Sequence, residues 1–250
     1  MDIAMPGPDP RRSALIIVDM QNDFVHPDGG FARCARENPQ RGWDMQFVMG
    51  TIPQVRRLLD VFRSAGRPVI YIITTHDRGY ADAQWPHWRS GLTGENRTFL
   101  IEGSWGAQIA DELKPRNGEH IVVKKGYGGF SNTPLDTILR HLGITTCVVA
   151  GVTTTVCVST TLRGGVGHNY HMILVEDAVA ETSRELHEAE VKILGLAFAA
   201  EVKTTDGVVA TLDDLAAVRN WNLSRANELA LEGVCSRIPR SIEALMADLG

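Results

Sequence analysis

Three side chains in this sequence could together carry out nucleophilic chemistry: Cys157, Asp19 and Lys124. A thiolate attacks carbonyl carbons, a carboxylate can accept the thiol proton, and an ammonium group can stabilise the charges that form. Cys157 lies where an expected strand passes into an expected helix, and a helix N-terminus favours thiolate over thiol. Asp19 and Lys124 close the apolar runs 13–19 and 120–124. Together the three supply the groups that a cysteine amidase needs.

Each of these residues also has a purely structural interpretation. A free cysteine is most often a small buried hydrophobe, and an aspartate after a strand is often a turn residue. Lys124, with Lys125 beside it, could be a solvated surface lysine. The three residues together are stronger evidence than any one of them. A carboxylate at a buried strand end must be solvated, paired or protonated, and the ammonium group of Lys124 could pair with Asp19. Cys147 lies within an apolar run and is expected to be buried, whereas Cys34 and Cys235 receive no role.

Apolar runs typical of buried strands alternate along the chain with amphipathic stretches. We expect strands at 13–19, 68–74, 120–124, 146–151, 171–176 and 200–204. Helices are expected at 51–65, 104–113, 133–142, from Cys157 onward and at 183–199. This alternation predicts a three-layer αβα sandwich with a mostly parallel six-stranded sheet. In open sheets of this kind ligands bind at the carboxyl ends of strands, which is where the three reactive residues are expected.

The chain divides into three parts in this interpretation. Residues 1–12 include four prolines and glycines and are expected to be a disordered leader. Residues 13–217 are expected to form the α/β domain. Residues 218–250 are expected to form a C-terminal helical extension. Segments 22–49 and 77–103 are irregular and long, which is typical of lids or binding loops. Specificity is expected to reside in these two loops.

Composition excludes several classes of partner. The net charge is -5 and no dense Lys/Arg tract occurs, so nucleic-acid binding is not expected. No apolar run approaches the ~18 residues of a membrane span, so no membrane partner is expected. The four cysteines form no CxxC pair. We therefore expect a cytoplasmic protein with free thiols, acting on a small molecule.

Three motifs resemble, in the same order, those of the isochorismatase-like (cysteine hydrolase) superfamily. They are LIIVDMQNDF at 15–24, KKGYGGFSNT at 124–133 and GVTTTVCV at 151–158, and the resemblance extends over 13–217. It implies a three-layer α/β fold with Asp19, Lys124 and Cys157 as catalytic triad, Lys124 rather than Lys125 matching the family lysine. It also implies a cis peptide bond between Val152 and Thr153, and an oxyanion hole made of the backbone N–H groups of Thr153 and Cys157.

Within the superfamily, FSNTPLD at 130–136 and GSW at 103–105 resemble ureidoacrylate amidohydrolases, whose near relatives hydrolyse biuret and triuret. The resemblance implies a cysteine-dependent amidohydrolase that cleaves a C–N amide bond of a small ureido or carbamoyl compound through a thioester, releasing ammonia or a carbamate or amine. Ordinary packing is an equally good interpretation of the residues that could bind this substrate. These are Asn22, Phe24, Trp105, Tyr127, Phe130, Asn132 and Thr154.

Other functions on the same fold stay open. A nicotinamidase, a maleamate amidase and an N-carbamoyl amino acid amidase cannot be separated by spacing alone, whereas Cys157 disfavours the vinyl-ether hydrolases, which lack it. A non-catalytic binding module would not require all three triad residues. The nicotinamidase branch has a metal motif with a histidine two residues after an aspartate, but Gly79 stands two residues after Asp77. We therefore expect no metal and no other cofactor, although His76 and His87 could approach a metal. The resemblance implies a homodimer or homotetramer.

Overall fold

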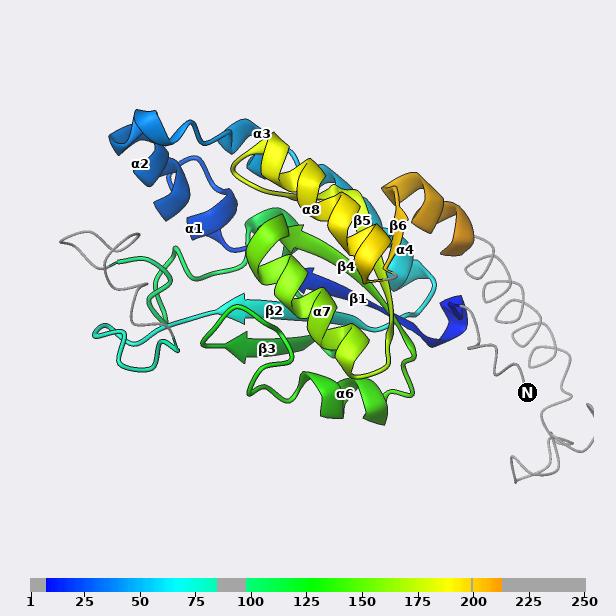
Figure 1. Cartoon of the computed structure of the whole chain (residues 1–250). Coiled ribbons are helices and arrows are strands. Elements are labelled where there is room, and N and C mark those ends of the chain that lie inside the picture. Colours follow the sequence, from blue (N-terminus) through cyan, green and yellow to red (C-terminus); the bar gives the residue numbers. More distant parts are fainter. Residues whose placement is uncertain (1–7, 85–97, 199, 213–250) are drawn as a thin grey trace, which may run out of the picture.

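The computed structural model describes residues 8–84, 98–198 and 200–212. Six strands form one sheet: β1 (Ser13–Val18), β2 (Val69–Thr74), β3 (His120–Lys124), β4 (Thr146–Val152), β5 (His171–Ala180) and β6 (Glu201–Lys203). Their order is β3-β2-β1-β4-β5-β6, and every neighbouring pair is parallel. Helices cover both faces (Figure 1), so the predicted three-layer αβα sandwich with a six-stranded parallel sheet is confirmed.

The two faces of the sheet bury two separate apolar cores. Along β1, Leu15 and Ile17 point into one core, and Ile16 and Val18 point into the other, as the two-residue period of a strand requires. Every residue of β1 is buried, because a central parallel strand is covered on both faces. This explains why its sequence is a continuous apolar run.

The helices divide between the two faces. α4 (Ile52–Ser64) packs on the first core, while α6 (Leu135–His141), α7 (Ser159–Gly167) and α8 (Arg184–Ala197) contribute to the second. Figure 1 shows α7 in front of the sheet and α4 behind it. These helices agree with the expected ranges to within a few residues. A further helix begins at Thr205 and continues to the end of the described residues.

The irregular segment expected at 22–49 contains three short helices: α1 (Asn22–Val25), α2 (Gly30–Glu37) and α3 (Met45–Met49). A 3-10 turn, Pro39–Arg41, lies between the second and the third. These elements are too short to be stable in isolation, and their contacts with one another and with the sheet hold them. The segment is therefore an ordered cap over one end of the sheet.

The prediction of a helix at 104–113 is wrong, because only a 3-10 turn, Asp111–Leu113, is present there. The backbone of this segment bonds to the chain after β1 instead of to itself. The N–H groups of Asn22 and Asp23 donate to carbonyls of Gln108 and Gly106, and the Ala110 N–H donates to the Met20 carbonyl. The hydrogen bonds that a helix would have used are thus taken by a distant segment.

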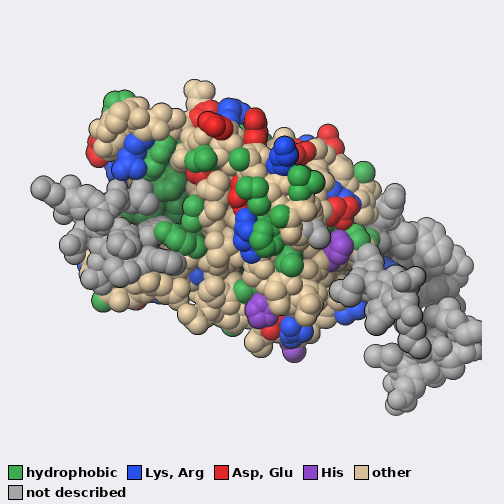
Figure 2. Space-filling model, in the orientation of Figure 1, with side chains coloured by type: hydrophobic (Ala, Val, Ile, Leu, Met, Phe, Trp, Pro, Cys, Tyr) green, Lys and Arg blue, Asp and Glu red, His purple; other side chains and the backbone are tan. Residues whose placement is uncertain are grey.

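The ends of the chain are only partly described. Pro10–Arg12 forms a 3-10 turn, and the Asp9 N–H donates to Thr146 Oγ1, so the described end of the expected leader lies against β4. The expected extension at 218–250 lies outside the described residues. None of the helices within the described ranges is long and apolar enough to cross a membrane. Figure 2 shows hydrophobic side chains dispersed among charged ones over α7 and α8.

Candidate active site

The topology of the sheet brings the reactive residues to one edge. From β1 the chain winds outward through β2 to β3, and then crosses back to β4 on the other side of β1. Ligands of open α/β sheets bind at the carboxyl ends of the strands where the winding direction reverses. Asp19 follows β1 and Cys157 follows β4, so they flank this crevice, and Lys124 ends β3. The reversal explains why residues 138 positions apart can meet.

The three side chains form one buried cluster. Lys124 Nζ donates to Asp19 Oδ2 at 2.8 Å and lies 3.4 Å from Cys157 Sγ. Asp19, Lys124 and Cys157 are 0%, 1% and 3% exposed, respectively. Asp19 itself has a left-handed backbone, with φ of 51°, a conformation that aspartate tolerates better than most residues. A salt bridge this deep is rare unless both partners are fully hydrogen-bonded.

Thr74, the last residue of β2, completes the hydrogen bonding of this ion pair. Its hydroxyl donates to Asp19 Oδ1 at 3.0 Å and accepts from Lys124 Nζ at 2.6 Å. The Gly126 carbonyl accepts a further bond from Lys124 Nζ at 3.2 Å. Because β2 lies between β1 and β3, its terminal hydroxyl fills the gap between the carboxylate and the ammonium group. Sequence reasoning missed this residue, although the strand-end argument applied to Asp19 would have found it.

Burial and charge set the protonation states in the cluster. Burial raises the pKa of the Cys157 thiol, and the Asp19 carboxylate raises it further, so the resting residue is a thiol. Burial lowers the pKa of Lys124, but the charge and hydrogen bond of Asp19 oppose this, and the net pKa is raised. Lys124 therefore remains an ammonium group. The cluster therefore holds a neutral thiol close to Asp19 and to a positively charged lysine.

The nucleophile lies in a tight turn between β4 and α7. The Val152–Thr153 peptide bond is cis, as the family resemblance implied. A π-helical turn, Thr154–Val158, follows it, and the Thr153 carbonyl accepts the N–H groups of Val156 and Val158. Cys157 is thus inside the first turn of the helical segment rather than at its first position. The oxyanion hole of Thr153 and Cys157 N–H groups stays a prediction.

A cavity of about 260 Å³ opens over Cys157. This is enough for a small organic molecule rather than a polymer. Among the residues expected to bind substrate, the described lining includes Phe24 and Tyr127, together with Thr153 of the expected oxyanion hole. Sequence reasoning had not proposed its other members, which are Phe31, Arg41, Trp43, Val156, Glu181 and Thr182.

The other five proposed binding residues lie outside this lining. Asn22 is buried, and its amide donates to the Trp105 carbonyl, while the Trp105 ring is 46% exposed and packs against His26. Phe130 stacks on His168, with ring centroids 5.1 Å apart.

Asn132 is exposed in a turn with φ of 56°. Thr154 is fully buried, and its hydroxyl lies 3.0 Å from His187 Nδ1. These positions favour the packing interpretation that the sequence had left open for the set.

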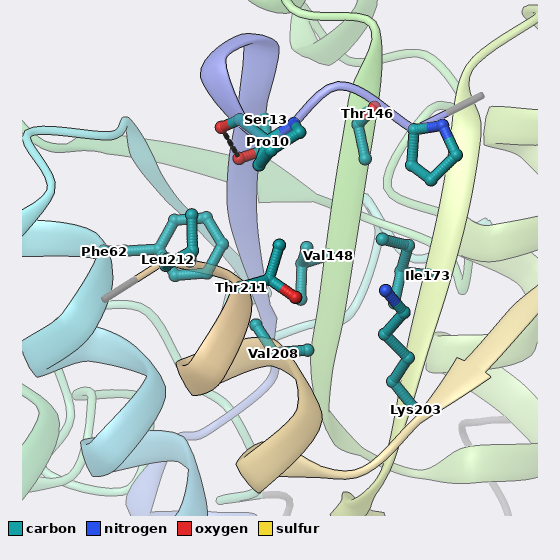
Figure 3. Close-up of a pocket in the computed structure, with 11 residues that line it drawn as sticks. Pro10, Ser13, Phe62, Thr146, Val148, Ile173, Lys203, Val208, Thr211 and Leu212 are labelled. Carbon is teal, nitrogen blue, oxygen red and sulfur yellow. Dashed lines mark hydrogen bonds between the residues drawn. The ribbon is translucent and has the colours of Figure 1, made fainter. Parts of the chain in front are cut away.

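A second cavity lies at the opposite, amino-terminal end of the sheet. It has a volume of about 90 Å³, and residues from the starts of β1 and β4, among them Ser13 and Thr146, line it (Figure 3). Its walls are mostly apolar, with Phe62, Val148 and Leu212 pointing inward. The cluster of Asp19, Lys124 and Cys157 lies at the other ends of the strands, so this cavity is separate from the candidate site.

No group of three or more His, Cys, Asp or Glu side chains that could hold a metal occurs among the described residues. His76 is buried and its Nδ1 lies 3.2 Å from Asp82 Oδ1. The other oxygen of Asp82 pairs with Lys125 at 2.6 Å. His87 lies outside the described residues.

Cys34, Cys147 and Cys157, the cysteines that the structure describes, are all free thiols.

A parallel α/β sandwich with a buried Asp–Lys–Cys cluster at its switch point defines a class of cysteine hydrolases, and comparison with known proteins agrees. The model of the isochorismatase domain family matches residues 13–206. The chain therefore belongs to the isochorismatase family and is a hydrolase of that family.

Solved structures with the same fold include a protein described as a cysteine hydrolase and another described as an amidase. A cysteine hydrolase from Pseudomonas syringae pv. phaseolicola 1448A is 26% identical, with a TM-score of 0.72 over 86% of this chain and 100% of that one. N-carbamoylsarcosine amidase from Thermoplasma acidophilum is 30% identical, with a TM-score of 0.62 over 78% of this chain and 97% of that one. An isochorismatase family protein from Desulfovibrio vulgaris is 28% identical, with a TM-score of 0.68 over 83% and 99% of the two chains.

Proposed function

We propose that this protein is a cysteine-dependent amidohydrolase that cleaves a C–N amide bond of a small ureido or carbamoyl compound, of the ureidoacrylate, biuret or triuret type. The observation that carries the proposal is the contact of the Lys124 ammonium group with both the Asp19 carboxylate and the Cys157 sulfur, at 2.8 and 3.4 Å. Of this cluster, Cys157 lines a cavity of about 260 Å³, a size that suits a small molecule.

In the first step Asp19 accepts the proton of the Cys157 thiol as the sulfur attacks the carbonyl carbon. The raised pKa of the thiol means that a base must act during attack, since little thiolate exists beforehand. Lys124, held as an ammonium group, offsets the negative charge passing from carboxylate to sulfur. The carbonyl electrons move to oxygen, and the N–H groups of Thr153 and Cys157 receive the oxyanion; one such donor contributes about 3 kcal/mol.

In the second step the C–N bond breaks and Asp19 returns its proton to the leaving nitrogen. Ammonia or an amine departs, and the acyl group remains on Cys157 as a thioester. A water molecule then gives its proton to Asp19 and attacks the thioester carbonyl. The C–S bond breaks, and the proton on Asp19 returns to the sulfur.

Three observations support a carbamoyl or ureido substrate. The chain shares its fold and 30% identity with an N-carbamoylsarcosine amidase. The 130–136 and 103–105 motifs resemble those of ureidoacrylate amidohydrolases. The cavity combines aromatic walls, which pack on a planar group, with the polar side chains of Glu181 and Thr182.

The test is ammonia release by the purified full-length protein on a panel of ureidoacrylate, biuret, triuret, an N-carbamoyl amino acid, maleamate and nicotinamide. We expect turnover of a carbamoyl or ureido compound, and a loss of at least about 10³-fold in kcat for Cys157→Ser. Cys34→Ser removes a free thiol outside the cavity lining and should keep full activity.

Two outcomes would contradict the proposal. Full turnover by Cys157→Ser would exclude the thioester route. Activity of the wild-type protein on maleamate or nicotinamide alone would retain the cysteine amidase but refute the carbamoyl class.

A further inference from the structure

The active-site cavity has a marked charge asymmetry. Among the lining residues that the structure describes, only Arg41 and Glu181 carry a formal charge. Glu181 follows β5 and bonds to Thr155 in the nucleophile turn, whereas Arg41 ends the 3-10 turn Pro39–Arg41 in the cap above the sheet. The carboxylate of Glu181 is therefore bonded to the turn that carries Cys157. The guanidinium of Arg41 lies on the part of the cavity wall that the cap contributes.

Glu181 is already satisfied by the protein. One carboxylate oxygen accepts from the N–H and hydroxyl of Thr155, and the other accepts from the N–H and hydroxyl of Thr182. Four donors use the hydrogen-bonding capacity of a carboxylate. Glu181 consequently holds the nucleophile turn in place, and its charge disfavours an anionic substrate group at this end of the cavity.

Arg41 is in the opposite situation. Among the described residues its guanidinium has no hydrogen-bond acceptor and no carboxylate partner, and its Cζ lies over the ring of Trp43, 5.2 Å from the ring centroid. Trp43 in turn packs against Phe31, with centroids 5.2 Å apart. The planar fork of N–H donors on Arg41 is therefore open to a planar anion, and an aromatic ring beside a guanidinium is compatible with such binding.

The loop that carries Arg41 is fastened to the sheet. The Asp44 N–H donates to the Thr182 carbonyl at 2.8 Å, and the Asp44 carboxylate pairs with Arg184 at 2.9 Å. Asp44 also caps α3 by accepting from the Phe47 N–H. These bonds tie the end of the 3-10 turn to the end of β5. The backbone just after Arg41 is thus tied to the sheet, while the Arg41 side chain itself is exposed at the wall of the cavity.

We propose that Arg41 binds a carboxylate of the substrate, so that the enzyme selects carbamoyl compounds that carry a carboxylate over uncharged ones. This inference rests on the proposed amidase function and narrows it. It favours the ureidoacrylate and N-carbamoyl amino acid class and disfavours biuret and triuret, which have no carboxylate. The planar guanidinium forms two parallel bonds with a carboxylate, and the charge of Glu181 turns the uncharged carbamoyl end of the molecule toward Cys157.

The experiment compares N-carbamoylglycine with N-carbamoylglycinamide, in which a neutral amide replaces the carboxylate, and follows the glycine or glycinamide set free when the carbamoyl group is cleaved. We expect wild-type kcat/KM to favour the carboxylate, and Arg41→Gln to lower kcat/KM for it by about 10- to 100-fold, mainly through KM. The value for the neutral amide should stay within about twofold. Arg41→Lys should recover part of the loss, because it keeps the charge without the planar fork.

Arg36→Gln is the matched control. It removes the same charge from neighbouring α2, where Arg36 bonds to the Pro27 carbonyl and does not line the cavity. An equal loss in this variant, or an unchanged preference in Arg41→Gln, would overturn the inference and leave the amidase function intact.

If the wild-type protein hydrolysed neither compound, titration calorimetry of both with wild-type and Arg41→Gln protein would decide the role of Arg41 separately. Binding of the carboxylate compound that weakens in Arg41→Gln supports the inference. Equal binding in both proteins, or no binding, overturns it.

Discussion

Thr74 shows how a single hydroxyl can hold a buried ion pair in a reactive arrangement. It both donates to Asp19 and accepts from Lys124, at 3.0 and 2.6 Å. Its backbone is fixed in turn by Gln21, whose side chain accepts the Thr74 N–H and donates to the Thr74 carbonyl. The position of the base therefore depends on residues that do not react.

We predict that Thr74→Val lowers kcat by about 10- to 100-fold and the free energy of unfolding by about 1–3 kcal/mol. The methyl group fills the space, but it leaves two buried charged groups each short of a hydrogen bond. Thr74→Ser keeps the hydroxyl and should therefore retain most of the wild-type kcat and most of the unfolding free energy. Steady-state kinetics and chemical denaturation measure the two effects, and wild-type kcat in Thr74→Val would contradict the role assigned to the hydroxyl.

The Asp19–Lys124 pair allows stability and catalysis to be separated. Lys124→Met leaves Asp19, which is fully buried, without its cation, and we expect a loss of about 3–5 kcal/mol in unfolding free energy. Adding Asp19→Asn removes the uncompensated charge and should restore much of that stability. Both variants should be inactive, because the single variant lacks the cation and the double variant lacks both the cation and the proposed base. Restoration of activity in the double variant would refute the roles proposed for the pair.

At the scale of the elements, the close approach of β4 to β1 is decisive. Gly151 pairs with Val18 across these strands and has φ of 119°, a conformation that favours glycine. A Cβ at this position would stand 2.0 Å from the Val18 carbonyl oxygen. Any side chain here would separate the strands that carry Asp19 and the nucleophile turn.

Gly151→Ala is therefore expected to cost at least about 4 kcal/mol, or to prevent folding altogether, because backbone atoms cannot yield as a flexible side chain can. Gly143→Ala is the matched control, since Gly143 also has positive φ, 66°, but no atom lies within 4 Å of the added Cβ. It should cost only the conformational strain, about 1–2 kcal/mol. Circular dichroism shows whether each variant folds, and thermal unfolding measures its stability. Similar losses of stability in the two variants would show that crowding at Val18 is unimportant.

At the scale of the whole molecule, a nearly buried ion pair joins the layer of α4 to the edge of the sheet. Arg63 in α4 donates to both oxygens of Glu119, at 2.7 and 2.9 Å, just before β3 begins. Burial raises the pKa of Glu119, but the hydrogen bonds from Arg63 and from the Arg116 N–H outweigh it, so the pKa lies below its usual value of 4.5.

A carboxylate with a depressed folded-state pKa stabilises the fold above its unfolded pKa and loses that contribution as the pH falls through the folded value. We therefore expect Glu119→Gln to cost about 1–3 kcal/mol at pH 7. The difference from wild type should hold down to about pH 4.5 and shrink below it. Asp60→Asn, which breaks the exposed pair with Arg56, should cost less than about 0.5 kcal/mol. A pH-independent difference for Glu119→Gln would contradict this assignment.

The sequence by itself determined the six strands and the large helices that cover the sheet, and it indicated the residues that we propose to react. Continuous apolar runs identify central strands because both faces of a parallel sheet are covered, and polar residues at their ends identify the reactive edge. Asp19, Lys124 and Cys157 followed from that logic together with the three motifs. Strand β5 proved longer than expected, ending at Ala180 rather than at residue 176, because polar Glu176 and Asp177 interrupt its apolar run.

Only the tertiary structure decided which residues surround the reaction. Arg41 and Trp43 come from the cap after β1 and Glu181 from the end of β5, and nothing local in the chain indicates that these distant segments share one cavity. The 104–113 segment failed as a helix for the same reason, since its backbone bonds to the residues after β1. Periodicity and strand-end chemistry are local and can be seen in a sequence. The walls of a cavity depend on how distant loops pack, and only the folded chain fixes that.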